Sequence, residues 1–203
     1  MRQFISEVVK RAFDVALAVL GLVVLAPVLA IIAVAIGLDS PGPVFYRGLR
    51  AGRHGKPFRI FKFRTMVVNA DKIGGPSSTA DDPRITSIGN FLRRFKLDEL
   101  SQLLNVIKGE MSFVGPRPEV MQEVVLYTDQ EKRLLDVRPG ITDWASIKFR
   151  NEGELLMGSP DPHQAYLEKI RPEKVRLGLE YVRSRSFLID CRIILLTLKA
   201  IFE

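Results

Sequence analysis

The chain has 203 residues and a formal net charge of +7, from 30 Lys and Arg against 23 Asp and Glu. This length accommodates one domain with a sizeable core, or a smaller domain plus a membrane element. The positive charge favours an anionic partner: a phosphorylated substrate, anionic lipid or nucleic acid. A single cysteine excludes an internal disulfide framework, and two histidines far apart in sequence give no visible zinc-type cluster.

The N-terminal region contains a segment, residues 15–38, without any charged residue, which is enough for one bilayer crossing of about 20 residues. Pro27 lies in its middle, where a proline removes a backbone donor and kinks a helix. Basic residues flank both ends, and the positive-inside tendency places both flanks in the cytoplasm. Two topologies remain open: a single kinked span, or a re-entrant hairpin that turns at Pro27 and leaves by the same face.

Residues 58–66, FRIFKFRTM, alternate with a period of two and predict a strand. Strand geometry would place Lys62 and Arg64 on one face, where both could be directed at a phosphate. Taken alone, they are equally well explained as surface charges. Residues 69–84 are poor in apolar side chains and rich in Gly, Pro, Ser and Asp, which predicts a mobile loop.

A second amphipathic helix is predicted around residues 88–95, with Arg93 on the face opposite the apolar residues. The side chains expected to face inward are Ile88, Phe91, Leu92 and Phe95.

Residues 98–108 are predicted as a helix because Leu97, Leu100, Leu104 and Ile107 recur at helical spacing and Gly109 supplies a stop. Asp98 and Glu99 then lie in the first turn, where free N–H groups and the helix dipole favour ionised carboxylates. The two acids point about 100° apart, so they could flank a small site, one attacking and one holding a metal ion. Ordinary capping explains the same pattern.

The acidic pair is followed by Gly115-Pro116-Arg117-Pro118, a stiff turn that fixes Arg117 in place. Carboxylates facing a fixed arginine suit phosphate chemistry, in which the arginine binds phosphate oxygens and a divalent cation neutralises the remaining charge.

The rest of the chain is predicted to be mainly structural. Residues 119–137 are predicted as helical with a break near 128–129, and residues 161–183 as packing helices. Residues 186–202 are strongly apolar but interrupted by charges, which predicts a helix lying flat at a membrane interface. A buried core helix is the open alternative for this last segment.

Residues 97–118, LDELSQLLNVIKGEMSFVGPRP, resemble the signature of the bacterial sugar transferases known as monotopic phosphoglycosyl transferases. These enzymes start glycan assembly on a polyprenyl phosphate carrier. The similarity extends to FRIFKFRTM upstream and to RPGIT at residues 138–142, so several separated blocks occur in the family's order. Many relatives read RPGITGWAQVNGRN here, whereas this chain has Asp143, Ser146 and Lys148-Phe149 before Arg150.

The resemblance implies a mainly α fold with a few short strands, inserted into the membrane from one side. It divides the chain into a re-entrant hairpin (1–40), a cytoplasmic catalytic domain (41–185) and a C-terminal interfacial amphipathic helix (186–203). It places the protein at the cytoplasmic face of the bacterial inner membrane. The hairpin would break at Pro27, although relatives often have a serine before this proline where this chain has Ala26.

The resemblance also implies a reaction: transfer of a sugar-1-phosphate from a UDP-sugar to polyprenyl (undecaprenyl) phosphate, releasing UMP, as the first membrane step of glycan synthesis. Asp98 would be the nucleophile and form a phospho-aspartate, and Glu99 would hold Mg²⁺. The expected substrate-binding residues are Lys62, Arg64, Arg93, Arg117 and Arg150.

The expected partners are the UDP-sugar, the polyprenyl phosphate and membrane lipids, without nucleic acid, and a homodimer is left open. Two other functions remain open from the sequence. One is a membrane adaptor that binds anionic lipid or nucleic acid, which gives no reason for an Asp-Glu pair before a GPRP turn. The other is a hydrolase of nucleotide sugars, which differs only in its acceptor.

Overall fold

The computed structural model describes residues 2–75 and 77–202, with side chains described from Glu7 to Ala200 apart from residue 76. Met1, Pro76 and Glu203 lie outside the described residues. They belong to the predicted hairpin (1–40), the predicted loop (69–84) and the predicted C-terminal helix (186–203). Helices dominate, and the strands of the described part form three two-stranded sheets. The prediction of a mainly α fold with a few short strands is confirmed.

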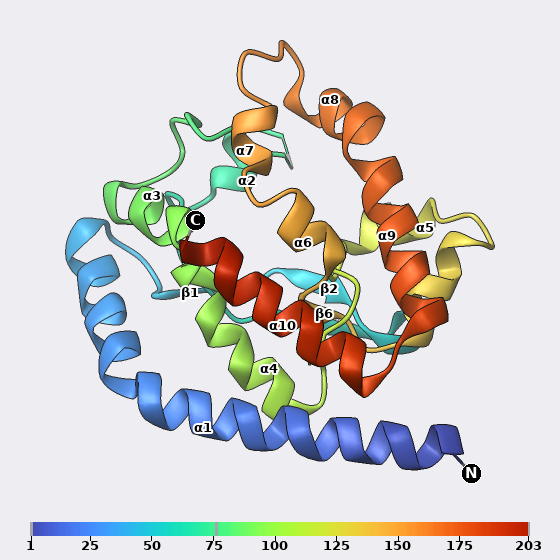
Figure 1. Cartoon of the computed structure of the whole chain (residues 1–203). Coiled ribbons are helices and arrows are strands. Elements are labelled where there is room, and N and C mark those ends of the chain that lie inside the picture. The colour runs from blue at the N-terminus through green and yellow to red at the C-terminus, as the bar shows by residue number, and fades with distance from the viewer. Residues whose placement is uncertain (1, 76, 203) are drawn as a thin grey trace.

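The longest element is α1 (Arg2–Asp39), one continuous helix with Pro27 inside it. Figure 1 shows this helix running along the lower edge of the molecule and then bending upward toward α3 (Ser87–Arg94). A proline inside a helix removes one backbone hydrogen bond and is an ordinary cause of such a bend. The turn predicted at Pro27 is therefore a bend within one helix.

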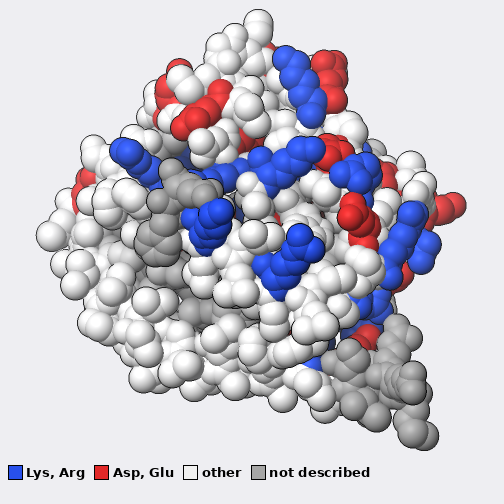
Figure 2. All heavy atoms as spheres, viewed as in Figure 1, with Lys and Arg blue, Asp and Glu red and all other residues white. Residues whose placement is uncertain are grey.

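The surface of α1 is apolar over most of its length. The stretch Glu7–Asp39 contains an 18-residue window with a mean hydropathy of 3.0 and, by length and composition, could cross a membrane. Only 11% of its most apolar window is buried inside the molecule. In Figure 2 the lower part of the visible face, over α1, carries almost no charged side chain among the described residues. So large an exposed apolar surface requires a non-aqueous covering, which is compatible with membrane insertion.

Both arms of α1 pack against the rest of the chain. In the first arm, Ala18 is fully buried against Leu103 and Val106 of α4 (Leu103–Lys108). In the second arm, Ile32 and Ile36 belong to a different apolar cluster, together with Phe63 and Leu92. The two arms are therefore tied to one globular body.

The predicted strand at residues 58–66 is two strands with different partners. Strand β3 (Pro57–Arg59) pairs with β2 (Leu49–Ala51), and β4 (Lys62–Phe63) pairs with β1 (Phe45–Tyr46). Between them the chain changes direction, and the fully buried Asn105 bonds it on both sides. Its Oδ1 accepts from Phe61 N at 2.8 Å, and its Nδ2 donates to Arg59 O at 3.0 Å.

This break overturns the predicted joint orientation of Lys62 and Arg64. The side chain of Arg64 is buried and donates to Ile36 O at 3.2 Å, Ser40 O at 2.6 Å and Pro41 O at 2.8 Å. The last carbonyls of a helix have no partner within the helix, so a buried guanidinium satisfies them well. Arg64 therefore caps the end of α1 and does not point with Lys62 at a common ligand.

The predicted helices in the middle of the chain are found with two corrections. Helix α3 buries Leu92, but Phe91 and Phe95 are 55% and 40% exposed, because α3 packs on the molecule along one narrow side only. The predicted helix at 98–108 is composed of a 3-10 turn, η2 (Leu97–Gln102), followed by α4. Gly109 ends it with φ of 83°, as predicted.

The GPRP turn and the RPGIT segment lie side by side. Strands β5 (Ser112–Val114) and β6 (Gly140–Thr142) pair in parallel, and Gly115 N donates to Thr142 O at 3.1 Å. A Cβ added at Gly115 would come within 2.3 Å of Arg138 O, so only glycine permits this approach. Two sequence blocks that are separate in the chain therefore form one structural unit.

The second half of the chain surrounds this unit. Its helices are α5 (Met121–Val125), η3 (Glu131–Asp136), α6 (Trp144–Lys148), α7 (Glu152–Leu155), α8 (Pro162–Lys169), α9 (Arg171–Ser184) and α10 (Phe187–Phe202). The short elements of the first half are η1 (Arg53–Gly55) and α2 (Ala70–Ile73). In Figure 1, α6 to α9 lie on the side away from α1, and α10 crosses between α4 and α6.

Helix α10 has one buried face and one exposed apolar face, and its position at a membrane interface stays a prediction. Ile193 and Asp190 are buried, whereas Leu188 and Leu195 are 79% and 67% exposed. One face is therefore core, and the other presents apolar side chains outward.

A buried carboxylate joins α1 to the strand before the GPRP turn. Asp14 is 2% exposed and accepts from Ser112 Oγ at 2.7 Å and from Phe113 N at 3.3 Å. Buried charges are costly unless they are paired and hydrogen-bonded, so this contact fixes the position of α1 on β5.

A second set of contacts ties α10 to the same strand. Lys10 Nζ lies 2.6 Å from Asp190 Oδ2, and Tyr181 OH donates to Asp190 Oδ1 at 2.8 Å. The same hydroxyl lies 3.1 Å from Val114 O. Helices α1, α9 and α10 therefore all meet at β5.

Arg64→Met should lower the free energy of unfolding by about 1–3 kcal/mol, because buried carbonyls at the end of α1 lose their donor. The KM for the UDP-sugar that the resemblance implies should stay unchanged. Thermal unfolding in detergent micelles and steady-state kinetics measure the two effects. Arg59→Met is the matched control, because Arg59 is exposed on the neighbouring strand and donates to Arg47 O there. A raised KM at unchanged stability would restore Arg64 as a binding residue.

Candidate active site

The acidic pair is held by a lysine from a neighbouring strand. Strand β4 carries Lys62 over the 3-10 turn η2, where Asp98 and Glu99 lie. Lys62 Nζ is 2.9 Å from Asp98 Oδ2 and 3.3 Å from Glu99 Oε1. Lys62 therefore lies between the two acids, and its role in binding a substrate stays a prediction.

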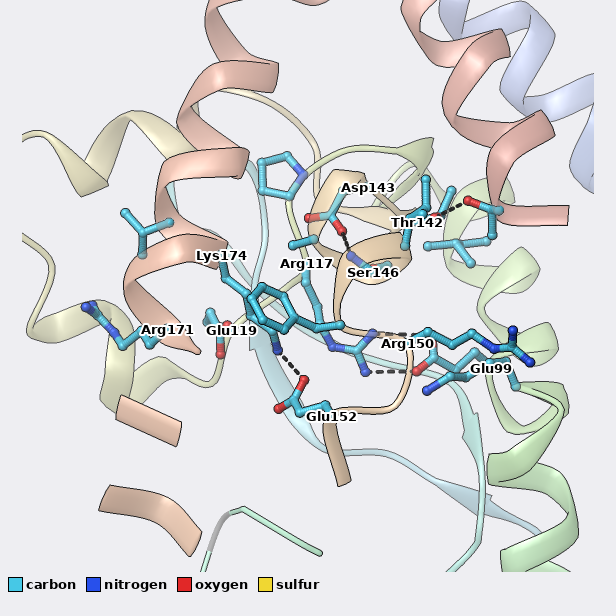
Figure 3. A pocket seen from close by; sticks show the side chains of 18 of the residues that line it. Glu99, Arg117, Glu119, Thr142, Asp143, Ser146, Arg150, Glu152, Arg171 and Lys174 are labelled. Atoms are coloured by element: carbon cyan, nitrogen blue, oxygen red, sulfur yellow. Dashed lines mark hydrogen bonds and ion pairs between the residues drawn. The ribbon is translucent and has the colours of Figure 1, made fainter. Parts of the chain in front are cut away.

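Glu99 also faces the arginine of the GPRP turn. Arg117 Nη2 donates to Glu99 Oε1 at 2.8 Å, and Nη1 donates to Oε2 at 3.4 Å. Figure 3 shows this bidentate contact, the geometry in which arginine binds carboxylates most strongly. Burial would raise the pKa of Glu99, but Arg117 and Lys62 outweigh it and hold that pKa well below its usual range. In turn, Glu99 raises the pKa of Arg117.

Asp98 lies deeper than its neighbour. It is 1% exposed, and its Oδ1 has no hydrogen-bond partner among the described residues. A buried carboxylate oxygen without a donor is uncommon in native structures and marks a place where a ligand or ion can bind. Lys62 pairs with the other carboxylate oxygen, Oδ2.

Beside this cluster is a cavity of about 220 Å³. Its walls come from η2, the GPRP turn, α6, α9 and α10, which are far apart in sequence. The basic residues that line it are Lys96, Arg117, Arg150, Arg171 and Lys174. The acidic residues are Glu99, Glu119, Glu123, Asp143 and Glu152. Such a wall offers many donors and acceptors to a polar ligand.

The structure brings most of the predicted site residues to one place. Glu99, Arg117 and Arg150 line the cavity, and Lys62 and Asp98 adjoin it through Glu99. Arg64 does not belong to this group, because it caps α1.

Arg93 lies beside the group rather than in the cavity wall. Its Nε donates to Thr65 Oγ1 at 3.2 Å, and its Nη1 donates to Ser78 Oγ at 3.0 Å. Burial lowers the pKa of Arg93, and the charge of Asp98 opposes that shift. Arg93 therefore adds positive charge near Asp98 and contacts the 69–84 loop.

The loop predicted at 69–84 is attached to the second half of the chain. Ala80 N donates to Gly153 O at 3.0 Å, and Ser77 Oγ lies 3.1 Å from His163 Nδ1. Whether the loop moves over a substrate stays a prediction.

Several cavity residues were missed by the sequence analysis. The segments 119–137 and 161–183 were expected to be structural, yet they supply Glu119, Glu123, Tyr127, Tyr166, Arg171 and Lys174 to the cavity. No motif or spacing in these segments marks the residues, because only the tertiary contacts of α9 with α6, α8 and η3 bring them here.

The donor set suits a partly hydrated magnesium ion. The described residues contain no group of three or more His, Cys, Asp or Glu placed to hold a metal. Mg²⁺ commonly keeps several waters and binds through one or two carboxylates plus substrate phosphates. Glu99 and the unpartnered oxygen of Asp98 match that smaller requirement.

Comparison with known proteins identifies the family of the chain. Residues 5–203 match the family described as bacterial sugar transferase. The chain belongs to that family. A UDP-glucose:undecaprenyl-phosphate glucose-1-phosphate transferase of Escherichia coli K12 is 42% identical over 202 residues, covering 95% of this chain and 40% of the relative.

Two further relatives of this sugar transferase differ in length. An undecaprenyl-phosphate glucose phosphotransferase of Komagataeibacter xylinus is 41% identical, covering 94% of this chain and 35% of the relative. The uncharacterized sugar transferase EpsL of Bacillus subtilis is 37% identical, covering 96% of this chain and 87% of the relative. The chain therefore spans less than half of the first two relatives and most of the third.

The pH dependence of stability tests the ion pairing of Glu99 in this sugar transferase. The folded pKa of Glu99 lies below its unfolded value of about 4.3, so its contribution to stability is complete above that pH. It should be lost as the pH falls through the lower, folded pKa. The difference in unfolding free energy between wild type and Glu99→Gln should therefore be constant near neutrality and shrink in acid. Denaturant unfolding from pH 7 to pH 2 measures it.

The exposed Glu154→Gln serves as the control for general acid destabilisation. A difference between wild type and Glu99→Gln that grows as the pH falls would contradict the pairing.

Proposed function

We propose that the protein transfers a sugar-1-phosphate from a UDP-sugar to a polyprenyl phosphate. The observation that carries this proposal is the cluster in which Lys62 and Arg117 neutralise Asp98 and Glu99 beside a cavity. The relative from Escherichia coli is named as a transferase of glucose-1-phosphate between UDP-glucose and undecaprenyl phosphate, and the one from Komagataeibacter xylinus as an undecaprenyl-phosphate glucose phosphotransferase. These names support the same reaction class here.

The transfer would proceed in two displacements at phosphorus. In the first, a carboxylate oxygen of Asp98 bonds to the sugar-linked phosphorus, and UMP leaves with the electrons of the broken P–O bond. In the second, an oxygen of the polyprenyl phosphate bonds to the same phosphorus, and the Asp98 carboxylate leaves. A carboxylate is a weak nucleophile, so the site must supply alignment and charge neutralisation.

The ion pairs explain how a buried carboxylate could become available. Phosphate oxygens entering the site would offer Lys62 and Arg117 alternative acceptors. When the two cations pair with the substrate instead, Asp98 and Glu99 would be released. The same cations then neutralise charge on the phosphoryl group during displacement. Glu99 would hold Mg²⁺, which supplies further charge neutralisation at the phosphate oxygens.

The surroundings of α1 support a position at the cytoplasmic face of the bacterial inner membrane. Both arms of the bent helix pack on the same globular body, and basic residues flank the apolar segment at both ends. A helix that crossed the bilayer fully would carry one arm away from that body. We therefore infer that α1 enters and leaves by one face, bending at Pro27, and that the exposed apolar side of α10 lies in the interface.

Asp98→Asn should abolish transfer, with a loss of at least a thousandfold in kcat, because the amide cannot form the acyl phosphate. Wild-type protein given a UDP-sugar without lipid should release about one UMP per enzyme molecule and then stop. Rapid-quench measurement of UMP with and without polyprenyl phosphate tests both statements.

Glu154→Gln, on the exposed side of α7, is the control and should show the wild-type burst. Continuous UMP release without lipid would favour a hydrolase, and an active Asp98→Asn enzyme would remove the covalent route.

Membrane topology is tested by cysteine labelling in a Cys191→Ser background. Val8 and Lys56 are exposed and lie on either side of the apolar segment. Val8→Cys and Lys56→Cys should both react with an impermeant thiol reagent in inverted membrane vesicles, and neither should react in intact spheroplasts. Labelling of the two positions from opposite sides would establish a spanning helix instead.

A further inference from the structure

The cavity of about 220 Å³ is lined by residues from several elements. Different parts of its wall can therefore bind different parts of a nucleotide sugar: phosphates, nucleoside or sugar.

The two ends of the cavity differ in chemistry. Figure 3 shows Glu99 and Arg150 at one end, with the guanidinium of Arg117 reaching toward them. Lys174 and Glu119 lie toward the other end, where Lys174 pairs with Glu152, and Asp143 and Ser146 lie on the α6 wall above Arg117 in this view. We call the part of the cavity lined by Asp143, Ser146 and Lys174 the α6–α9 subsite.

The cations at this end are already neutralised. Lys174 forms an ion pair with Glu152, and Arg171 Nη2 lies 2.8 Å from Glu131 Oε1. As at Arg117, a phosphate entering here would have to displace a carboxylate from each cation. Neutral hydroxyl groups, in contrast, can add hydrogen bonds to a paired cation and a paired carboxylate without separating them.

Asp143 gives the α6–α9 subsite a buried carboxylate. It is 3% exposed, and its Oδ1 accepts from Ser146 N at 2.6 Å. Burial raises the pKa of this carboxyl group. A carboxylate in the cavity wall accepts hydrogen bonds from hydroxyl groups and repels phosphate.

The aromatic rings of the cavity are already engaged by other groups. Lys174 Nζ lies 4.9 Å from the centre of the Tyr166 ring, and the imidazole of His163 stacks on that ring at 6.5 Å. The guanidinium of Arg171 lies 5.8 Å from the centre of the Tyr127 ring. A pyrimidine base gains most from an open aromatic face, so these contacts favour a hydroxyl-rich group over the nucleoside.

We propose that the α6–α9 subsite binds the hydroxyl groups of the transferred sugar, with Asp143 as acceptor and Lys174 as donor. This assignment rests on the proposed use of a nucleotide sugar. It makes Asp143, Ser146 and Lys174 the residues that distinguish one donor sugar from another, whereas Arg117 and Arg150 bind the part that all donors share.

The test compares full-length Asp143→Asn and Lys174→Met with wild type in lipid nanodiscs. The donors are UDP-glucose, UDP-galactose and UDP-N-acetylglucosamine with polyprenyl phosphate, and UMP serves as a competitive inhibitor. Each variant should lower kcat/KM for the preferred donor about tenfold to a hundredfold and change the ratio between donors. The inhibition constant of UMP should stay within about twofold of wild type, because one lost hydrogen bond to the sugar leaves nucleotide binding intact.

Lys148→Met is the matched control. Lys148 lies on the same helix as Ser146 but does not line the cavity, and it pairs with Glu173 outside it. This variant should keep wild-type donor ratios. Asp143→Asn retains an oxygen that can accept from Ser146 N, and thermal unfolding verifies that both cavity variants are folded.

The outcomes separate this inference from the proposed reaction. Parallel weakening of UMP inhibition would assign the subsite to the nucleoside and overturn the inference. Unchanged donor ratios in both variants, in an enzyme that transfers normally, would overturn it as well. Failure of the wild type to release UMP from any donor would instead overturn the reaction itself.

Discussion

The contact between Glu99 and Arg117 is the interaction on which the rest of the site depends. It joins the 3-10 turn after α3 to the GPRP turn after β5, two segments that approach each other only in the folded chain. Lys62 adds a third segment to the same pair of acids. A cluster with two cations and two carboxylates is close to neutral when empty. An incoming phosphate can therefore exchange places with a carboxylate without exposing an uncompensated charge.

Much of the scaffold serves to hold these three segments in position. Asn105 fixes the change of direction between β3 and β4, which turns Lys62 toward the acids. Arg64, just after β4, holds this segment against the end of α1. Asp14 and Tyr181 bond the strand that leads into the GPRP turn. Helix α1 is therefore part of the framework of the site. Movement of α1 relative to the body would disturb β5 and, through it, Arg117.

The proposed reaction gives a physical reason for combining an exposed apolar helix with a polar cavity. The apolar surface of α1 and the outer side of α10 face outward, while the cavity lies among α6, α9 and the turns. In that reaction, a polyprenyl phosphate would carry its charged group at the membrane surface, and a nucleotide sugar would arrive from water. A site fixed between the two environments would let both reach one phosphorus, which saves the entropy of bringing them together in solution.

The sequence by itself determined the apolar segment, the bend at Pro27, the helix stop at Gly109 and the stiff turn that carries Arg117. These features follow from local rules: hydropathy, proline and glycine geometry, and motifs confined to short stretches. Tertiary structure alone decided that Arg64 caps α1, that Phe91 and Phe95 are exposed, and that Tyr166 and Lys174 line the cavity. Their roles depend on which distant segment packs beside them, because a single arginine or lysine has the same local pattern on a surface, at a helix end or in a binding site. Periodicity shows which residues share a face, but only the packed neighbours determine what that face meets.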